Sequence, residues 1–419
     1  MRVRQRELSH RPELTDDLGN TCARYRGSQR RQQNLGLAAA VRHFNDRAVP
    51  GIGGMWFPMP ILWSVLAISI AEELGVPALP VGNAVEARVM LEVIAGPQDR
   101  RVRGARKMQG LKDSSFHNLR RRGTYVVQPI RMAMVQPLVA LGFVQGSRYG
   151  AFRIHSAGRE LLELNAMKEP RRLLGAWAHG RQPHGLKEAL AVLSPVGAVP
   201  EAVRKLILSR LLDGNDPGST RRRALARLGT GPSSAHLDQE TALAGVAPDH
   251  WSDLRAGAAF MDIRDAALTV LDQLEQHLLK LRDDNQPVRL SEAEAAEVAV
   301  EPLKQLRDLA SAKGALVDQG NEETSRRLIA EIRNLSDQQL IQRLAERDST
   351  VICQCEGHIV LGPAAGELRG SSETQDENRP PQDEAFAPQL FRLHNLHCLV
   401  TELSGKVNPG SRDAGSEAV

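Results

Sequence analysis

The chain of 419 residues contains few cysteines and few aromatic residues, and each scarcity excludes a class of protein. Four cysteines, Cys22, Cys353, Cys355 and Cys398, are too few and too irregularly spaced for a disulfide framework, which suits a reducing compartment. Aromatic residues make up 4% of the chain, whereas leucine and alanine are plentiful. This composition favours helices packed on helices over an aromatic-rich β-sandwich, so we expect a mainly α fold.

Long hydrophobic runs are also lacking. The most apolar stretch, residues 55–71, is about 17 residues long and contains Pro58 and Pro60, whereas a membrane-spanning helix needs about 20 apolar residues. We therefore expect a buried helix from Ile61 to Leu74 and no membrane partner. The arginines near residue 1 precede no apolar core before residue 35, so they do not form a secretory signal, and a cytoplasmic location is expected.

Signatures of common enzyme reactions are missing from the sequence. It contains no Walker A lysine, no G-x-S-x-G nucleophile elbow, no H-E-x-x-H motif and no complete dinucleotide fingerprint. The glycines at 51–54 lack the lysine that follows a phosphate-binding loop, and they are predicted to form a turn. The sequence therefore predicts no cofactor. It leaves open whether the protein is an enzyme, because catalytic groups can lie far apart along a chain.

One group of residues has the chemistry of a metal site. Thiolate and imidazole ligands in a tetrahedral array suit zinc. The candidate ligands are Cys353, Cys355, His358, His394, His397 and Cys398. Their C-x-C spacing differs from the C-x-x-C knuckle of common zinc modules. The alternative is that they are buried or half-exposed cysteines beside helical histidines.

Basic residues are concentrated in residues 98–122. This stretch contains nine cations and only two acids, Asp99 and Asp113. Its local charge of +7 therefore exceeds the +4 of the whole chain. The cations are Arg100, Arg101, Arg103, Arg106, Lys107, Lys112, Arg120, Arg121 and Arg122. Guanidinium groups match phosphate bidentately, so this segment predicts a salt-sensitive affinity for nucleic acid. The alternative is a solvated loop, or one that pairs with an acidic partner.

The patterns that follow, in residues 124–163, are ordered as a helix, a hairpin and a second helix. Apolar residues recur at helical spacing from Ile130 to Leu141, and Pro137 inside this stripe predicts a kink or two short helices. Strand-like runs at 143–144 and 151–154 enclose a polar loop bounded by glycines. Upstream, Asn83 is expected to begin a helix that continues to Ala95.

This order resembles the C-terminal half of winged-helix repressor domains, in which an LGF-like helix end leads into a hairpin and then a helix with a Gly-Arg and Leu-Leu start. The sequence reads LGF at 141–143 and SAGRELL at 156–162, and the resemblance covers about forty residues. It implies a groove-reading helix that carries Arg131 and Gln136, and a basic wing residue, Arg148, that touches the DNA backbone.

The alternative interpretation of the same region is a winged helix used for packing, dimerisation or protein binding. Met132, Met134 and Val135 give the presumed reading helix few groups that can hydrogen-bond base edges. A fold analogy does not by itself establish a site.

The second half of the chain is strongly periodic. A heptad seam runs through residues 260–281, with apolar side chains at Phe260, Ile263, Ala267, Leu271, Leu274, Leu278 and Leu281. It predicts either a helical hairpin within one chain or self-association through this helix. Capping patterns at Ser291 and Ser336 predict two further helix starts. A second basic spot at 221–223 is interpreted as an exposed helix face.

These patterns divide the chain into successive parts. They are a basic, poorly ordered segment (1–48), a winged-helix-like domain (50–165), a helical linker region (168–246), a helical hairpin domain with a short β-hairpin at 351–361 (250–362), an acidic disordered linker (363–385) and a docking helix (386–404).

Three hypotheses about function remain. The first is a non-catalytic protein that binds double-stranded DNA, the second is an adaptor subunit of an assembly acting on nucleic acid, and the third is a metal-dependent hydrolase or nuclease.

Overall fold

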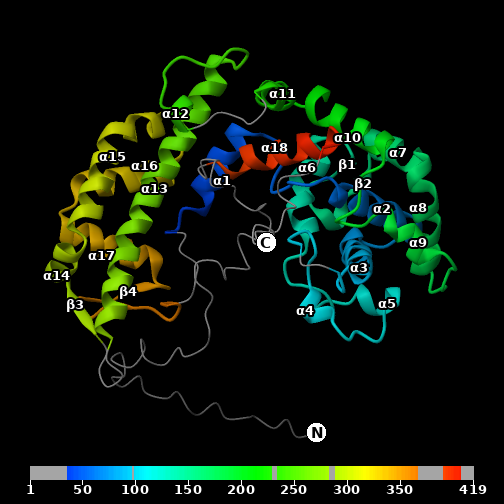
Figure 1. Cartoon of the computed structure of the whole chain (residues 1–419), viewed down its shortest axis with the longest axis horizontal. Helices are drawn as coiled ribbons and strands as arrows, with labels where there is room; N and C mark the ends of the chain where they lie inside the picture. Colours follow the sequence, from blue (N-terminus) through cyan, green and yellow to red (C-terminus); the bar gives the residue numbers. More distant parts are fainter. Residues whose placement is uncertain (1–34, 97–98, 229–233, 283–287, 367–389, 407–419) are drawn as a thin grey trace, which may run out of the picture. The chain divides into compact units, whose positions relative to one another are not determined.

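The computed structural model describes residues 35–96, 99–228, 234–282, 288–366 and 390–406 (Figure 1). The described chain is mainly helical with small antiparallel sheets, as the composition predicts. It divides into two compact units. Among the described residues, the larger unit comprises those within 37–265, 307–333 and 390–406, and the smaller comprises those within 35–36, 266–306 and 334–366. The predicted basic segment up to residue 34 and most of the predicted acidic linker lie outside the described residues.

The larger unit is built almost entirely from helices. Its elements are α1 (Ala38–Ala48), α2 (Met59–Leu74), α3 (Ala78–Leu91), α4 (Ala105–Met108), α5 (Phe116–Leu119), η2 (Ile130–Met134), α6 (Val135–Ala140), β1 (Val144–Gln145), η3 (Tyr149–Ala151), β2 (Arg153–Ile154), α7 (Ser156–Glu163), α8 (Asn165–Ala178), α9 (Leu186–Ala191), α10 (Glu201–Asp213), α11 (Ser219–Arg227), α12 (Ser234–Leu237), α16 (Glu323–Asn334) and α18 (Phe391–Leu403). The boundaries between the units fall within α13 (Pro248–Leu281) and α15 (Val300–Gln319), so each unit contains part of both helices.

Helix α2 is the centre of the larger unit. Every residue from Met59 to Ala71 is buried, and α3, α7 and α8 pack around it. Trp63 also donates its indole N–H to the Leu193 carbonyl oxygen, at 2.7 Å. The expected buried helix is confirmed. The glycine turn before it is confirmed as well, because Gly53 has a φ of 53° and any Cβ there would lie 2.8 Å from the Ala133 carbonyl oxygen.

Helix α3 begins earlier than the sequence indicates. It starts after Pro77 and ends at Leu91, so the prediction that Asn83 caps a helix to Ala95 is wrong. The Tyr149 hydroxyl lies within 2.8 Å of where a Cβ of Gly82 would stand, so this glycine admits the tyrosine ring in mid-helix. A tertiary contact thus outweighs the helix-breaking tendency of Gly82-Asn83.

The segment from Ile130 to Ile154 follows the predicted order. A 3-10 turn, η2, leads directly into α6, and Pro137 falls in the first turn of α6, where a missing N–H is tolerated. The predicted hairpin is confirmed, because β1 and β2 pair antiparallel with Val144 opposite Ile154. Helix α7 follows the hairpin, beginning at Ser156 with His155 as its N-cap.

The smaller unit combines helices with a three-stranded sheet. Its elements besides the shared helices are β3 (Arg289–Ser291), α14 (Glu292–Val298), α17 (Asp337–Asp348), β4 (Ile352–Cys355) and β5 (His358–Leu361). The predicted hairpin forms β4 and β5, and β3 adds antiparallel to β5 with Leu290 opposite Ile359. Both predicted helix starts are confirmed, since Ser291 and Ser336 form complete capping boxes.

The heptad seam lies on the continuous helix α13. Six of its seven side chains, from Phe260 to Leu278, are buried within the single chain, whereas Leu281 is half exposed. In the larger unit, Phe260 stacks on Phe44 of α1, with ring centroids 4.8 Å apart. The final helix, α18, packs against α1, α10 and α11.

Candidate nucleic-acid interface

The basic segment, residues 99–122, is held against α3 by apolar anchors. Met108, Phe116 and Leu119 are all buried, and α4 and α5, which carry them, both contact α3. Tyr125 is buried just beyond the segment. Because the anchors alternate with charged residues, the backbone is fixed while most charged side chains remain outside. The segment is therefore a structured surface, and its cations have defined positions.

Hydrogen bonds to main-chain carbonyl oxygens add to this anchoring. Asn83 of α3 donates to the Leu119 carbonyl at 3.1 Å, and the Lys107 ammonium donates to the Tyr125 carbonyl at 2.6 Å. The short helix α5 is capped by Ser115, whose hydroxyl accepts from the Asn118 N–H.

Seven cations of the basic segment are exposed, and we call them the exposed basic set: Arg100, Arg106, Lys107, Lys112, Arg120, Arg121 and Arg122. Asp113 is the one exposed acid of the segment. The Ser115 N–H, which donates to this carboxylate at 2.8 Å, lowers the pKa of Asp113, so it stays ionised. Exposed cations therefore outnumber exposed acids seven to one in this segment.

Two predicted contact residues of the same segment lie inside the fold. Arg101 is only 7% exposed and pairs with Asp99 at 2.7 Å, whereas Arg103 is 6% exposed and donates to the Gln128 carbonyl. Their guanidinium groups stabilise the fold of the segment, and we do not place them in the interface.

A buried carboxylate, Glu86 of α3, organises the region between the basic segment and the hairpin. Its two oxygens accept hydrogen bonds from the backbone N–H of Ile130 (2.7 Å) and of Arg131 (3.1 Å), and from the Tyr125 hydroxyl (3.2 Å). Burial raises the pKa of Glu86, while these N–H donors and the nearby guanidinium groups of Arg131 and Arg103 act in the opposite direction. No sequence motif marked this residue, which sits in a helix with few other charges.

Replacing Glu86 by alanine should destabilise the larger unit. The change removes the acceptor of two buried donors, the Ile130 N–H and the Tyr125 hydroxyl, and of the part-buried Arg131 N–H. We expect a loss of about 2–6 kcal/mol, since each unsatisfied buried donor costs about 1–3 kcal/mol. All four tryptophans, Trp56, Trp63, Trp177 and Trp251, lie in that unit, so their fluorescence during urea unfolding measures the change. Glu188→Ala, at an exposed position, is the control. Equal unfolding midpoints for both variants would contradict this role.

The predicted reading helix has few polar groups directed outward. Arg131 lies over the Tyr149 ring, 5.6 Å from its centroid, and donates to the Asn83 side-chain oxygen at 3.4 Å. Gln136 donates to the Asp46 carboxylate at 2.7 Å. Both predicted base contacts are thus engaged inside the protein, whereas Arg148 of the β1–β2 hairpin is exposed.

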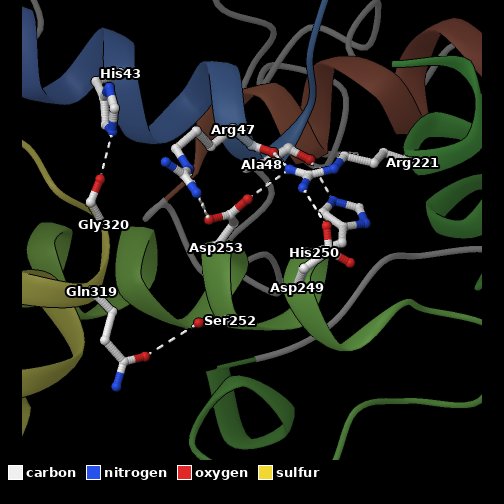
Figure 2. A network of polar contacts seen from close by, with 10 residues as sticks. All are labelled: His43, Arg47, Ala48, Arg221, Asp249, His250, Ser252, Asp253, Gln319 and Gly320. Atoms are coloured by element: carbon white, nitrogen blue, oxygen red, sulfur yellow. Dashed lines mark hydrogen bonds and ion pairs between the residues drawn. The ribbon is translucent and has the colours of Figure 1, made fainter. Parts of the chain in front are cut away.

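A polar network ties α1, α11 and α13 together (Figure 2). Asp253 accepts from Arg47 and from Arg221, both at 2.7 Å, and the His250 imidazole donates to the Ala48 carbonyl at 2.8 Å. Burial lowers the pKa of His250, so the neutral ring is favoured.

The prediction that residues 221–223 form an exposed basic face is wrong. Arg221 pairs with Asp253 in the network just described, and the side chain of Arg222 is fully buried. Arg221 is neutralised by Asp253, which is distant in sequence. Arg222 pairs with Asp216 but also donates to the distant Pro50 carbonyl, so the local charge pattern alone could not indicate their burial.

The candidate zinc ligands divide between the two units. Cys353, Cys355 and His358 lie on β4 and β5 of the smaller unit, with Cys355 opposite His358. His394, His397 and Cys398 lie on α18 of the larger unit, where the Cys398 sulfur is 3.6 Å from His394 Nε2. Among the described residues, no three His, Cys, Asp or Glu side chains are grouped so that they could hold a metal ion.

No family model, curated protein or solved structure matches this chain. Within the part of the chain that the structure describes, no helix combines the length and apolar character needed to cross a bilayer. The functional argument therefore depends on the charges, exposures and contacts given above.

Proposed function

We propose that the protein binds double-stranded DNA without catalysing a reaction on it, and that the exposed basic set makes the contact. The observation that carries this proposal is the excess of seven exposed cations over one exposed acid on an anchored segment. Arginine and lysine at this density neutralise phosphates and release the counter-ions condensed on a duplex, which favours binding regardless of base sequence.

The element order supports a winged-helix interpretation of the neighbouring region. Helices α2 and α3 precede η2 and α6, and the β1–β2 hairpin and α7 follow. In this interpretation the hairpin is the wing, and the exposed Arg148 would touch the DNA backbone.

The proposed contact is with phosphates rather than base edges. Arg131 and Gln136 are engaged inside the protein, while Met132 and Val139 of η2 and α6 are 55% and 41% exposed. Apolar side chains read base edges poorly, apart from the thymine methyl group. We therefore expect weak sequence preference.

A binding measurement with two unrelated duplexes of equal length tests this function. At low salt, fluorescence anisotropy of the full chain should give dissociation constants that agree within about threefold, because phosphate contacts carry no sequence information. Absence of binding to either duplex at micromolar protein would contradict the proposal. Strong preference for one duplex would contradict its phosphate-only form.

One observation favours a protein-binding adaptor as the second candidate. Val127 is 90% exposed and precedes η2, where Met132 is exposed as well. Exposed apolar side chains at the presumed reading helix suit a protein partner better than a DNA groove. Co-purification of a partner that is lost on Met132→Glu substitution, together with no duplex binding at low salt, would favour this function.

A further inference from the structure

A cleft of about 890 Å³ lies next to the basic segment, between α5 and the turn that joins α8 to α9. Helix α5 contacts both α3 and α8, and α8 contacts α9, so the walls belong to one packed region of the larger unit (Figure 1). Its volume falls within the roughly 300–1,000 Å³ of sites that bind small ligands. A cleft of this size takes a single nucleotide and not a double helix.

The cleft has an aromatic base. Phe116 of α5 and Trp177 of α8 meet edge to face, with ring centroids 5.3 Å apart, and both are lining residues. The guanidinium of Arg120 lies 5.7 Å from the Phe116 centroid, so one wall already presents a cation above an aromatic ring. Both rings are only 5% exposed and Arg120 lies over the Phe116 face, so ring edges rather than open ring faces meet the cleft, and a nucleobase would pack against these edges.

The rim carries hydrogen-bond donors that suit an anion. Three exposed cations and three exposed imidazoles line it: Arg120, Arg181, Lys187, His117, His179 and His184. Glu188 is the exposed acid in this lining. Guanidinium and ammonium groups form short, charge-assisted bonds with phosphate oxygens.

The turn that presents these groups has a defined backbone. Gly180 has a φ of 82° and closes α8, and the Arg181 N–H returns to the Ala176 carbonyl at 3.1 Å. Pro183 further restricts the loop before Gly185 begins α9, also at positive φ. The backbone of Arg181 is thus positioned by the fold before any ligand binds.

We propose that this cleft binds a nucleoside monophosphate, with the phosphate at Arg120, Arg181 and Lys187 and the base against Phe116 and Trp177. This inference goes beyond the proposed duplex binding and does not depend on it. The same chemical group occurs in a free nucleotide and at the 5′-phosphorylated end of a strand, so the test must distinguish these two sources.

Calorimetric titration of the full chain with AMP, adenosine and inorganic phosphate is the first arm of the test. AMP should bind, adenosine should bind at least about tenfold more weakly, and the double variant R181E/K187E should lose roughly 100-fold in AMP affinity, about tenfold for each cation removed. The matched control R172E/K205E reverses two exposed cations outside the cleft and should retain AMP binding. No AMP binding, or equal binding of AMP and adenosine, overturns the proposal.

A second arm compares 5′-phosphorylated and 5′-hydroxyl single-stranded oligonucleotides of one sequence. A preference of about tenfold for the phosphorylated strand, absent in R181E/K187E, assigns the site to strand ends. Equal binding of the two strands, alongside AMP binding, assigns it to free nucleotides. The variant R121E/R122E leaves the cleft lining unchanged, so loss of its duplex binding with AMP binding intact separates this proposal from the proposed function.

Discussion

Reversal of Arg121 and Arg122 to glutamate is expected to weaken duplex binding at low salt by roughly 100-fold or more. Both side chains are exposed at the end of the basic segment, and each substitution replaces a phosphate partner with a repelling charge. Arg120 is left unchanged because it lies over Phe116 and lines the cleft. Anisotropy titrations of the full-length variant and of the native protein measure the change.

The control for this prediction is R172E/K205E, which has the same net charge. Arg172 and Lys205 are exposed and paired with Glu169 and Glu201 outside the basic segment. If the control loses as much affinity as R121E/R122E, then total charge drives binding and the exposed basic set has no special role. Unchanged affinity in R121E/R122E would equally contradict the proposed interface.

Replacement of Arg222 by methionine is expected to destabilise the larger unit by about 3 kcal/mol, the lower end of the cost of removing one partner of a buried ion pair, because the half-buried Asp216 keeps the Gly218 N–H as a donor. The guanidinium forms two bonds with the Asp216 carboxylate, at 2.9 and 2.6 Å, and also donates to the carbonyl oxygens of Leu211 and Pro50. The side chain is fully buried, so methionine leaves Asp216 and both carbonyls without this donor.

Tryptophan fluorescence during urea unfolding measures this loss, with Arg223→Met as the neighbouring control. Arg223 is half-buried, pairs with the exposed Asp213 at 2.9 Å and donates to the Leu212 carbonyl, and because its ion pair is open to solvent we expect a smaller loss than for Arg222. The double variant R222M/D216A removes both charges and should recover part of the stability. Equal midpoints for R222M and R223M would show that burial of the guanidinium does not contribute to stability.

The sequence predicted those elements whose signals are local. The capping boxes at Ser291 and Ser336, the hairpins at 144–154 and 352–361, and the buried helix α2 each depend on residues close together in the chain. Periodicity and turn chemistry operate over that same range, so these features are visible before folding.

Features that depend on distant partners were not predicted. Strand β3 pairs with β5 across about seventy residues, and Glu86 accepts from backbone groups more than forty positions away. Arg222 has a nearby aspartate, yet its burial also requires the Pro50 carbonyl. Such contacts are set by tertiary packing, which no local pattern reports.

The candidate interface was predicted only in part for the same reason. Charge counting identifies residues 99–122 as basic, but it treats all nine cations alike. The fold distinguishes them, because Arg101 and Arg103 are buried with partners, whereas the other seven are exposed, Lys107 among them although it also donates to the Tyr125 carbonyl. Arg131 and Gln136 likewise donate hydrogen bonds to Asn83 and Asp46, which lie on earlier helices.

The salt dependence of duplex binding tests the central claim most directly. For the native chain, a plot of log affinity against log salt concentration should have a slope of about −6, since each phosphate contact contributes about −0.9 and seven cations are exposed. In R121E/R122E the magnitude of the slope should fall by about two. A native slope near zero, or one identical in both proteins, would contradict the claim that these arginines neutralise DNA phosphates.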